Sequence, residues 1–201
     1  MTYEDYYKTA YPTLLAAEKQ LTELIGSYPH DDASDVKPIV YTLSRIKTPD
    51  SMIRKLQGRG LTPTLSAALT QVYDAVGIRI ICAFADDVFS VVNWLKAQPV
   101  LKIEKEKDYL TFPKPNGYRS YHLLVSVIND GEAPVHAEIQ IRTIAIDFWA
   151  TLEHQIKYKK DIPQRYDALL RSELKRCADE IASVDLSMQA LKELIKDFCS
   201  S

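Results

Sequence analysis

The strongest constraint on the fold is the alternating pattern of residues 136–142, which read HAEIQIR. Because successive side chains of a β-strand point to opposite faces of a sheet, this pattern predicts a strand with one apolar face and one polar face. Residues 76–84, VGIRIICAF, are apolar almost throughout and predict a second, largely buried strand. The chain is therefore expected to build its core around a sheet.

The remaining elements can be read in the same way. Further strands are expected at 37–47, 100–110 and 120–128, the strand that contains HAEIQIR is expected to span 134–144, and a turn is expected at Asn129, Asp130 and Gly131. Helices are expected at 3–25, 86–98 and 144–159, with one or two more after Pro163. Thr48 and Pro49 suit an N-cap and a first helical residue, and open a short helix that reaches about Leu56. The predicted class is α+β (mixed α/β), with a mixed, mostly antiparallel central sheet of about five strands flanked by helices.

The amino-acid composition limits the classes of function that the chain can have. With 46% hydrophobic and 26% charged residues over 201 positions, the chain has the composition of one globular domain. The net charge of -2 argues against affinity of the whole surface for duplex nucleic acid. The three cysteines have no CxxC spacing, and neither a signal peptide nor a membrane span is evident, so we expect a cytoplasmic protein with no membrane partner.

Local charge differs from this average. Residues 37–60 contain six basic side chains and one acidic one. Arg45 and Lys47 share one face of the predicted strand, and Ser51 and Lys55 share one face of the helix that follows. The four can converge at a helix N-terminus, which suits phosphate oxygens. A solvated basic surface explains the same residues equally well.

Two further patterns admit two interpretations each. In HAEIQIR, Glu138 is a carboxylate held on a strand, suited to a divalent cation or to accepting a hydroxyl proton, with Asp74 as a candidate partner. A water-facing sheet face and an ordinary turn residue explain these two residues without any chemistry. The loop KPNGYRSYH, 114–122, offers a ring, an amide and cations to a nucleobase, although a plain connecting loop also uses Pro-Asn-Gly.

Taken together, four segments resemble the synthetase domain of the RelA/SpoT family. They are YTLSRIKTPDSMIRKL, YDAVGIRIICAFADDVF, KDYLTFPKPNGYRSYHLLV and VHAEIQIRTIAIDFWATLEHQIKYK, in this order along the chain. The resemblance implies a nucleotidyltransferase-like synthetase fold in one domain over 1–201. It divides this domain into an N-terminal helix at 1–30, a catalytic core at 37–160 and C-terminal helices at 163–201.

The resemblance also implies an activity. Family members transfer the β,γ-pyrophosphoryl group of ATP to the 3'-hydroxyl of GDP or GTP, which yields AMP and ppGpp or pppGpp. Two alternatives from the residues stay open: a toxin of the same fold that pyrophosphorylates the 3' end of tRNA, and a catalytically silent regulator that binds nucleotide or RNA. The near-neutral charge fits the first poorly, and the presence of both carboxylates speaks against the second.

Residue roles follow from the resemblance alone. Asp74 and Glu138 would be catalytic and would hold Mg2+, with Glu138 as the general base. The ATP site would comprise Arg45, Lys47, Ser51, Lys55, Arg59 and Arg79. The GDP/GTP site would comprise Lys107, Lys114, Asn116, Tyr118, His122 and Gln140. Arg142 receives only a supporting role.

Several features depart from the family pattern or lie outside the site. The segment KLQGRG places Arg59 beside Gly58, where family members often carry further basic residues, and Lys107 stands where many carry arginine. The pair His30-Asp31 is not taken as a hydrolase site, because that activity needs a further metal-binding domain. Phe148, Trp149 and His154 are assigned to the core. By resemblance, we expect a homo-oligomer, with a tetramer as the expected size, and pppGpp or single-stranded RNA as candidate regulators.

Overall fold

The computed structural model describes residues 1–29, 37–128, 133–157 and 164–199. His30, Asp31 and the turn expected at Asn129, Asp130 and Gly131 lie outside these residues. The strands are β1 Ile39–Ile46, β2 Val76–Cys82, β3 Leu101–Asp108, β4 Tyr121–Val127 and β5 Val135–Thr143. The helices are α1 Tyr3–Tyr7, α2 Tyr11–Gly26, α3 Pro49–Gly58, α4 Leu65–Thr70, α5 Ala85–Lys96, α6 Ile144–Lys157 and α7 Asp167–Cys199, with 3-10 turns η1 Lys8–Ala10 and η2 Gln164–Tyr166.

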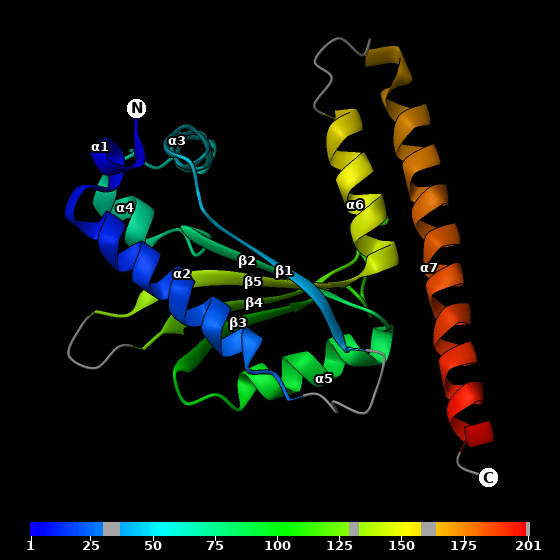
Figure 1. Cartoon of the computed structure of the whole chain (residues 1–201). Helices are drawn as coiled ribbons and strands as arrows, with labels where there is room; N and C mark the ends of the chain where they lie inside the picture. The colour runs from blue at the N-terminus through cyan, green and yellow to red at the C-terminus, as the bar shows by residue number, and fades with distance from the viewer. Residues whose placement is uncertain (30–36, 129–132, 158–163, 200–201) are drawn as a thin grey trace.

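The five described strands form one sheet in the order β1-β2-β5-β4-β3. Only β2 and β5 pair in parallel, and the other three pairs are antiparallel. The α+β class and the mixed, mostly antiparallel sheet predicted from the sequence are confirmed. Figure 1 shows α2 and α5 on one side of this sheet and the long α7 beside α6 at its end.

The covered face of the sheet carries the main core. Inward side chains of the strands pack there with the apolar stripes of α2 and α5, as the alternation in each strand requires. Fully buried members include Leu14, Leu21, Ile78, Ile80, Leu95, Leu123, Ile139 and Ile141. Burial on this scale stabilises by about 25 cal/mol per Å² of apolar surface. The opposite face is left free for polar side chains.

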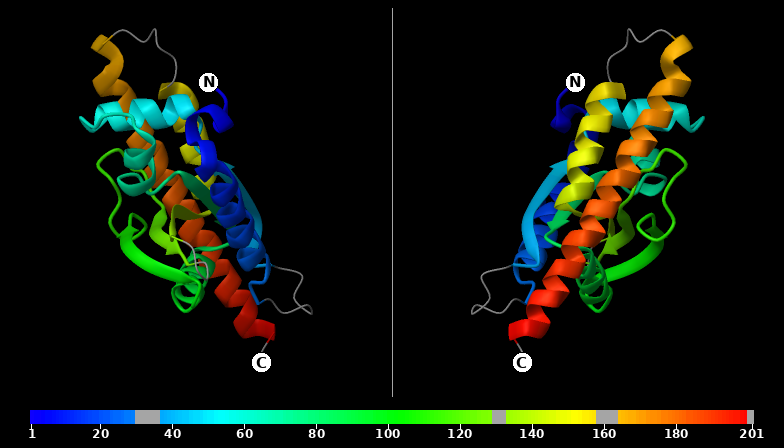
Figure 2. Two further views of the ribbon diagram at one scale, coloured as in Figure 1. Left: turned by 90° about the vertical axis from the view of Figure 1, so that its left-hand side faces the viewer. Right: turned by 90° about the vertical axis from the view of Figure 1, so that its right-hand side faces the viewer.

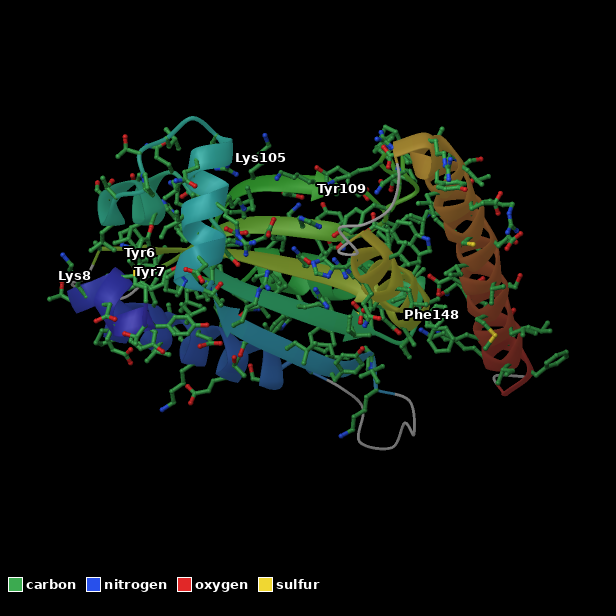
Figure 3. The ribbon with its side chains drawn as sticks, turned by 90° about the horizontal axis from the view of Figure 1, so that it is seen from above. Tyr6, Tyr7, Lys8, Lys105, Tyr109 and Phe148 are labelled. Atoms are coloured by element: carbon green, nitrogen blue, oxygen red, sulfur yellow. The ribbon has the colours of Figure 1, made fainter. Side chains whose placement is uncertain are left out.

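Cross-strand register gathers these polar side chains in rows. Arg45 lies opposite Gly77, which lies opposite Glu138. One step along, Arg79 lies opposite Gln140, which lies opposite His122. Figure 3 looks down on this face, with α3 above one end of the strands and α6 above the other.

The N-terminal helix is broken, so the prediction of one helix over 3–25 is wrong. Lys8 has a φ of 51° and begins a 3-10 turn, and α2 restarts at Tyr11. Pro12 accounts for the restart, because proline lacks the N–H of a helix interior and its ring clashes with the preceding turn, whereas the first turn tolerates it. The short α4 was not predicted. After Pro163 there is one long helix, α7, preceded by a 3-10 turn.

Of the three residues of α6 that were predicted to lie in the core, only one is buried. Trp149 is buried and donates its indole N–H to the Leu174 carbonyl oxygen of α7 at 2.9 Å, as expected of a core residue. Phe148 is 59% exposed and His154 is also exposed, so their assignment to the core is wrong. Figure 2 shows from two sides that α6 runs alongside α7, so its other face is left uncovered. No helix among the described residues is long and apolar enough to cross a membrane.

Candidate active site

A cavity of about 320 Å³ opens on the polar face of the sheet. Its lining comes from β1, β2, β5 and the loop before β2: Leu43, Ser44, Arg45, Asp74, Gly77, Ile78, Arg79, Glu138 and Gln140. Five of the residues predicted for the site, two arginines, two carboxylates and one amide, therefore share one cavity. A cavity of this size and polarity suits a small polar ligand.

At one end of the cavity two lysines converge on one carboxylate oxygen. Lys47 follows the last residue of β1, and Lys55 projects from α3. Their ammonium groups lie 2.8 Å and 2.6 Å from Oδ2 of Asp74. Burial acts to raise the pKa of Asp74, but the hydrogen bonds and charges of the two lysines outweigh it and hold this pKa below its usual value. Asp74 is therefore ionised, beside two cations that can also bind phosphate.

The second carboxylate, Glu138, has both oxygens hydrogen-bonded. His122 Nδ1 lies 3.1 Å from Oε1, and the Gln140 amide donates to Oε2 at 3.2 Å. Burial acts to raise the pKa of Glu138, but the hydrogen bonds from His122 and Gln140 outweigh it and lower this pKa to about 2. Burial lowers the pKa of His122, which favours its neutral form. The carboxylate is therefore charged and held in one orientation.

Two arginines border the cavity. The side chain of Arg45 crosses Gly77, where a Cβ atom would lie 3.7 Å from its Cγ and Nε. Arg79 lies two residues along β2, with its guanidinium 3.4 Å from Asp147 and its Nε buried without a hydrogen-bond partner in the described structure. Guanidinium planes at the edge of a cavity can stack on a purine or contact phosphate.

The loop 114–118 forms an aromatic corner at the other side of the polar face. Lys114 Nζ lies 4.6 Å from the ring centre of Tyr109 and 4.8 Å from that of Tyr118. Asn116 donates to Glu153 of α6 at 3.2 Å and accepts from the Tyr118 backbone N–H. Rings combined with a cation offer a flat base both a stacking surface and polar contacts.

The remaining predicted residues lie around this centre. Ser51 is in the first turn of α3, and its hydroxyl accepts from Thr48 at 2.8 Å. Lys107 lies opposite His122 across β3 and β4. Arg59 is exposed, and its guanidinium donates to the Gln71 carbonyl oxygen at 2.8 Å, so it caps the end of α4 and does not line the cavity.

The arrangement fits a magnesium ion. Oδ1 of Asp74 is buried and has no hydrogen-bond partner in the described structure, and Asp74 and Glu138 line the same cavity. Mg2+ prefers oxygen ligands, and is commonly held by one or two carboxylates together with substrate phosphates. No group of three or more His, Cys, Asp or Glu residues within the described ranges could hold a metal by itself.

Sequence reasoning underestimated two residues behind the site. Arg142 is 5% exposed and donates to the hydroxyl of Tyr118 at 2.7 Å and to Asp147 at 3.0 Å. Asp147 also accepts from Tyr41 at 3.1 Å. The alternation of β5 places Arg142 on the polar face, but its partners lie on other elements, and only the register brings them together.

Comparison with known proteins adds an independent line of evidence. Residues 44–163 match a family model described as the region found in RelA / SpoT proteins. The chain is 44% identical over 161 residues to GTP pyrophosphokinase YwaC of Bacillus subtilis, covering 78% of this chain and 75% of the relative. It is 33% identical over 175 residues to GTP pyrophosphokinase YjbM of the same organism, covering 85% and 79%.

Solved structures agree over nearly the whole length. The small alarmone synthetase 1 of Bacillus subtilis, bound to its product pppGpp, superimposes with a TM-score of 0.76 at 30% identity and covers 92% of this chain and 93% of its own. The small alarmone synthetase 2 of the same organism gives a TM-score of 0.72 at 39% identity, covering 90% and 92%. These similarities include the terminal helices as well as the sheet.

Proposed function

The chain belongs to the RelA/SpoT family, and from this premise we propose that it is a GTP/GDP pyrophosphokinase that makes pppGpp and ppGpp. ATP would be the donor, and the 3'-hydroxyl of GTP or GDP would be the acceptor. The observation that carries the proposal is that Asp74 and Glu138 line one cavity, and that Lys47 and Lys55 both donate hydrogen bonds to Oδ2 of Asp74. Two carboxylates beside paired cations suit a reaction in which a polyanion approaches a hydroxyl.

The donor site would lie at the β1 and α3 side of the cavity. Arg45, whose side chain crosses Gly77, and Arg79 both line the cavity, and we assign them to the two faces of the adenine. Lys47, Ser51 and Lys55 are assigned to the phosphates, where the N-terminus of α3 adds the positive end of the helix dipole. Arg59 would reach the phosphates only after leaving the Gln71 carbonyl, so its contribution is proposed as secondary.

The acceptor site would lie at the aromatic corner. Tyr118 would stack on the guanine, with Lys114, Asn116 and Gln140 nearby for polar contacts. His122 and Lys107 face one another across β3 and β4, on the way from this corner to Glu138. The base and the reacting hydroxyl of one nucleotide would thereby span this face of the sheet.

The chemistry follows from these assignments. The acceptor 3'-oxygen bonds to the β-phosphorus of ATP, the bond from that phosphorus to the α,β-bridging oxygen breaks, and AMP leaves with the oxygen. Glu138 orients the 3'-hydroxyl and takes its proton. A carboxylate with a pKa of about 2 is a weak base, which suffices because the transition state of phosphoryl transfer is loose and the proton leaves late. Mg2+ on Asp74 and Glu138 would neutralise phosphate charge.

The test is a transfer assay with purified protein, Mg2+, ATP labelled in its γ-phosphate, and GDP, GTP or bulk tRNA. We expect the label on guanosine penta- or tetraphosphate, with one AMP formed per transfer. A parallel sample of Glu138→Gln should form neither product. Label on tRNA alone would instead establish the toxin, and binding of nucleotide without transfer under any condition would establish the silent regulator.

We also propose that the whole chain, 1–201, acts as one synthetase domain in a homo-oligomer, with a tetramer as the expected size. Support comes from uncovered apolar side chains on the last two helices. They include Phe148 and Leu152 of α6 and Val184, Leu186, Leu191, Ile195 and Phe198 of α7, each more than 40% exposed. Light scattering of the purified protein tests the size.

Regulation and location complete the proposal. Both pppGpp and single-stranded RNA are proposed as regulators, to be tested by adding each to the transfer assay. A cytoplasmic location fits the nucleotide substrates and the free thiols of Cys82 and Cys177. Fractionation of cells that express the protein tests the location.

A further inference from the structure

Arg142 lies behind the site at the end of β5, and one of its nitrogens makes two hydrogen bonds. Nη2 donates to the hydroxyl oxygen of Tyr118 at 2.7 Å and to the amide oxygen of Gln140 at 2.9 Å. Nη1 donates to Asp147 at 3.0 Å, which anchors the guanidinium from the other side. With 5% of its surface exposed, the residue is shielded from solvent.

Both hydrogen-bonded chains from Nη2 end on Glu138. The first passes through the Tyr118 hydroxyl, which lies 2.9 Å from His122 Nε2, and through His122 Nδ1, which lies 3.1 Å from Glu138 Oε1. The second passes through Gln140, whose amide nitrogen donates to Glu138 Oε2 at 3.2 Å. The two carboxylate oxygens are therefore held by two chains that start from the same nitrogen.

The two ends of these chains set the direction of every bond. The Arg142 guanidinium can only donate, and the ionised Glu138 carboxylate can only accept. A neutral His122 therefore carries its proton on Nδ1, facing Glu138, and its Nε2 accepts from the Tyr118 hydroxyl, whose oxygen accepts from Arg142. In the same way Gln140 must turn its oxygen to Arg142 and its NH2 group to Glu138.

We infer that Arg142 is a positioning residue for the proposed transfer: through Tyr118, His122 and Gln140 it fixes the orientation of the Glu138 carboxylate that receives the acceptor's 3'-hydroxyl. This inference rests on the proposed function. It also links acceptor binding to the base, because the ring proposed to stack on guanine carries the hydroxyl that bonds His122 Nε2. Arg142 would not touch either nucleotide.

A purely structural role is the competing explanation. Arg142 and Asp147 form a buried ion pair between β5 and α6, with side chains 6% and 10% exposed, and removal of one member of such a pair is strongly destabilising. Loss of stability alone therefore proves nothing. The test needs variants that keep the protein folded and readouts that packing does not control.

Two variants separate the explanations. Arg142→Lys keeps a cation for Asp147 but cannot serve both chains, and Tyr118→Phe keeps the ring while removing the hydroxyl that joins Arg142 to His122. In each we expect kcat to fall about tenfold to a hundredfold, the range typical of residues that orient a catalytic group, while KM for ATP changes less than about threefold. In the double variant the Tyr118→Phe change should add less than about twofold, because the chain is already broken.

The 15N signals of His122 give a readout that does not depend on activity. With 15N-labelled histidine, NMR of the unmodified protein should show His122 neutral with its proton on Nδ1, assigned by loss of the signal in His122→Asn. Glu138 should keep that tautomer in both variants, but the Nε2 signal should shift, because Nε2 loses its donor in Tyr118→Phe and the fixed position of that donor in Arg142→Lys. If the protein makes no pppGpp, the proposed function fails while the Nε2 signal still tests the chain through Tyr118 and His122.

Lys192→Gln is the matched control. Lys192 of α7 is also a partly buried cation held by carboxylates, 2.8 Å from Asp86 and 3.0 Å from Asp87, but it lies outside the polar face of the sheet. We expect this variant to lose stability and keep kcat and the His122 spectrum. Folded Arg142→Lys and Tyr118→Phe proteins with unchanged kcat and an unchanged Nε2 signal would overturn the inference. If Arg142→Lys does not fold, the same outcome in Tyr118→Phe alone would do so.

Discussion

Tyr7 donates a hydrogen bond from its phenol to the carbonyl oxygen of Lys47, at 2.7 Å, across 40 positions of sequence. Tyr7 is fully buried on α1, and Lys47 is the residue whose ammonium group meets Asp74. The first helix of the chain thus supports the end of the strand that carries a proposed phosphate ligand. The relationship links the N-terminal region to the site without placing any of its side chains in the cavity.

Tyr7→Phe should therefore weaken both stability and donor binding. The variant leaves the Lys47 carbonyl oxygen without its partner, and a lost buried hydrogen bond costs about 1–3 kcal/mol. We expect a lower melting temperature and a KM for ATP raised severalfold, with little change in KM for GTP. Thermal unfolding and steady-state kinetics measure the two effects.

The neighbouring tyrosine provides the control. Tyr6 is 8% exposed, and its hydroxyl is buried without a hydrogen-bond partner in the described structure. Tyr6→Phe removes a polar atom that makes no bond, so stability should be unchanged or slightly higher. Equal losses of thermal stability and of ATP affinity in both variants would mean that the hydrogen bond from Tyr7 to Lys47 makes no specific contribution.

The loop before Tyr118 depends on a glycine. Gly117 has a φ of +86°, and a Cβ added there would lie 2.5 Å from the Cβ of Ala178 on α7. Gly117→Ala should thus destabilise by about 1–3 kcal/mol through backbone strain and displacement of the loop. Because the loop carries the proposed guanine-stacking ring, KM for GTP should rise more than KM for ATP.

Two further variants separate the effect of backbone strain at Gly117 from the effect of its contact with Ala178. Gly58, at the end of α3, has no atom within 4 Å of an added Cβ, so Gly58→Ala should be neutral or stabilising. Adding Ala178→Gly to Gly117→Ala removes the collision but not the positive φ, so stability should recover only in part. Full recovery would assign the whole effect to the contact with α7, and no loss in Gly117→Ala would refute both causes.

Prediction from the sequence succeeded where the signal is local. Alternation predicted β1 and β5, apolar and strand-like runs predicted the other three described strands, and the Thr48-Pro49 signal placed the start of α3 correctly. Lys47 and Lys55 converge, as one of the two interpretations of the basic segment predicted, and they meet on Asp74. These features depend on spacing within one or two elements, which a sequence displays directly.

Prediction from the sequence failed where contacts between distant parts of the chain determine the structure. The break at Lys8 precedes the apolar residues at helical spacing on which the prediction of 3–25 rests, so that pattern does not show it, and α4 is too short to show a period. Arg142 looked like a supporting motif residue because its bonds to Tyr118 and Asp147 depend on how β5, the loop before β4 and α6 come together. Phe148 has the apolar character of a core residue, and only the fold shows that nothing in the described chain covers it.

Substitutions of the two carboxylates in the cavity should impair the reaction in different ways. Glu138→Gln keeps the size of the side chain but removes the charge and the proposed proton acceptor, so kcat should fall at least a hundredfold while ATP binding is kept. Asp74→Asn should instead raise the Mg2+ concentration needed for half-maximal rate, because Asp74 has the buried unpaired oxygen. Measuring the rate of each variant as a function of Mg2+ concentration separates the two roles. The control is Glu104→Gln, because the carboxylate of Glu104 accepts a hydrogen bond from Ser126 and does not line the cavity.

The pH dependence of stability provides a prediction with opposite signs at two carboxylates. The pKa of Glu138 is lowered to about 2, so its ionised form stabilises the fold above the unfolded pKa, and this contribution is lost as pH falls from about 4 towards 2. Burial raises the pKa of Asp185, which accepts a hydrogen bond from Thr143 at 2.7 Å, above its usual value. There the protonated form favours folding, so stability is lost as pH rises through the raised pKa.

Asp185→Asn should therefore raise the free energy of unfolding at pH 7, because the amide keeps an acceptor for Thr143 without a buried charge. The gain should shrink as pH falls below 4, where the carboxyl of the unmodified protein is protonated in both states. Glu138→Gln should show the reverse: a stability loss at pH 7 that fades towards pH 2. Urea unfolding of the three proteins between pH 3 and 7 measures both differences, and two curves that run parallel to that of the unmodified protein would contradict both assignments.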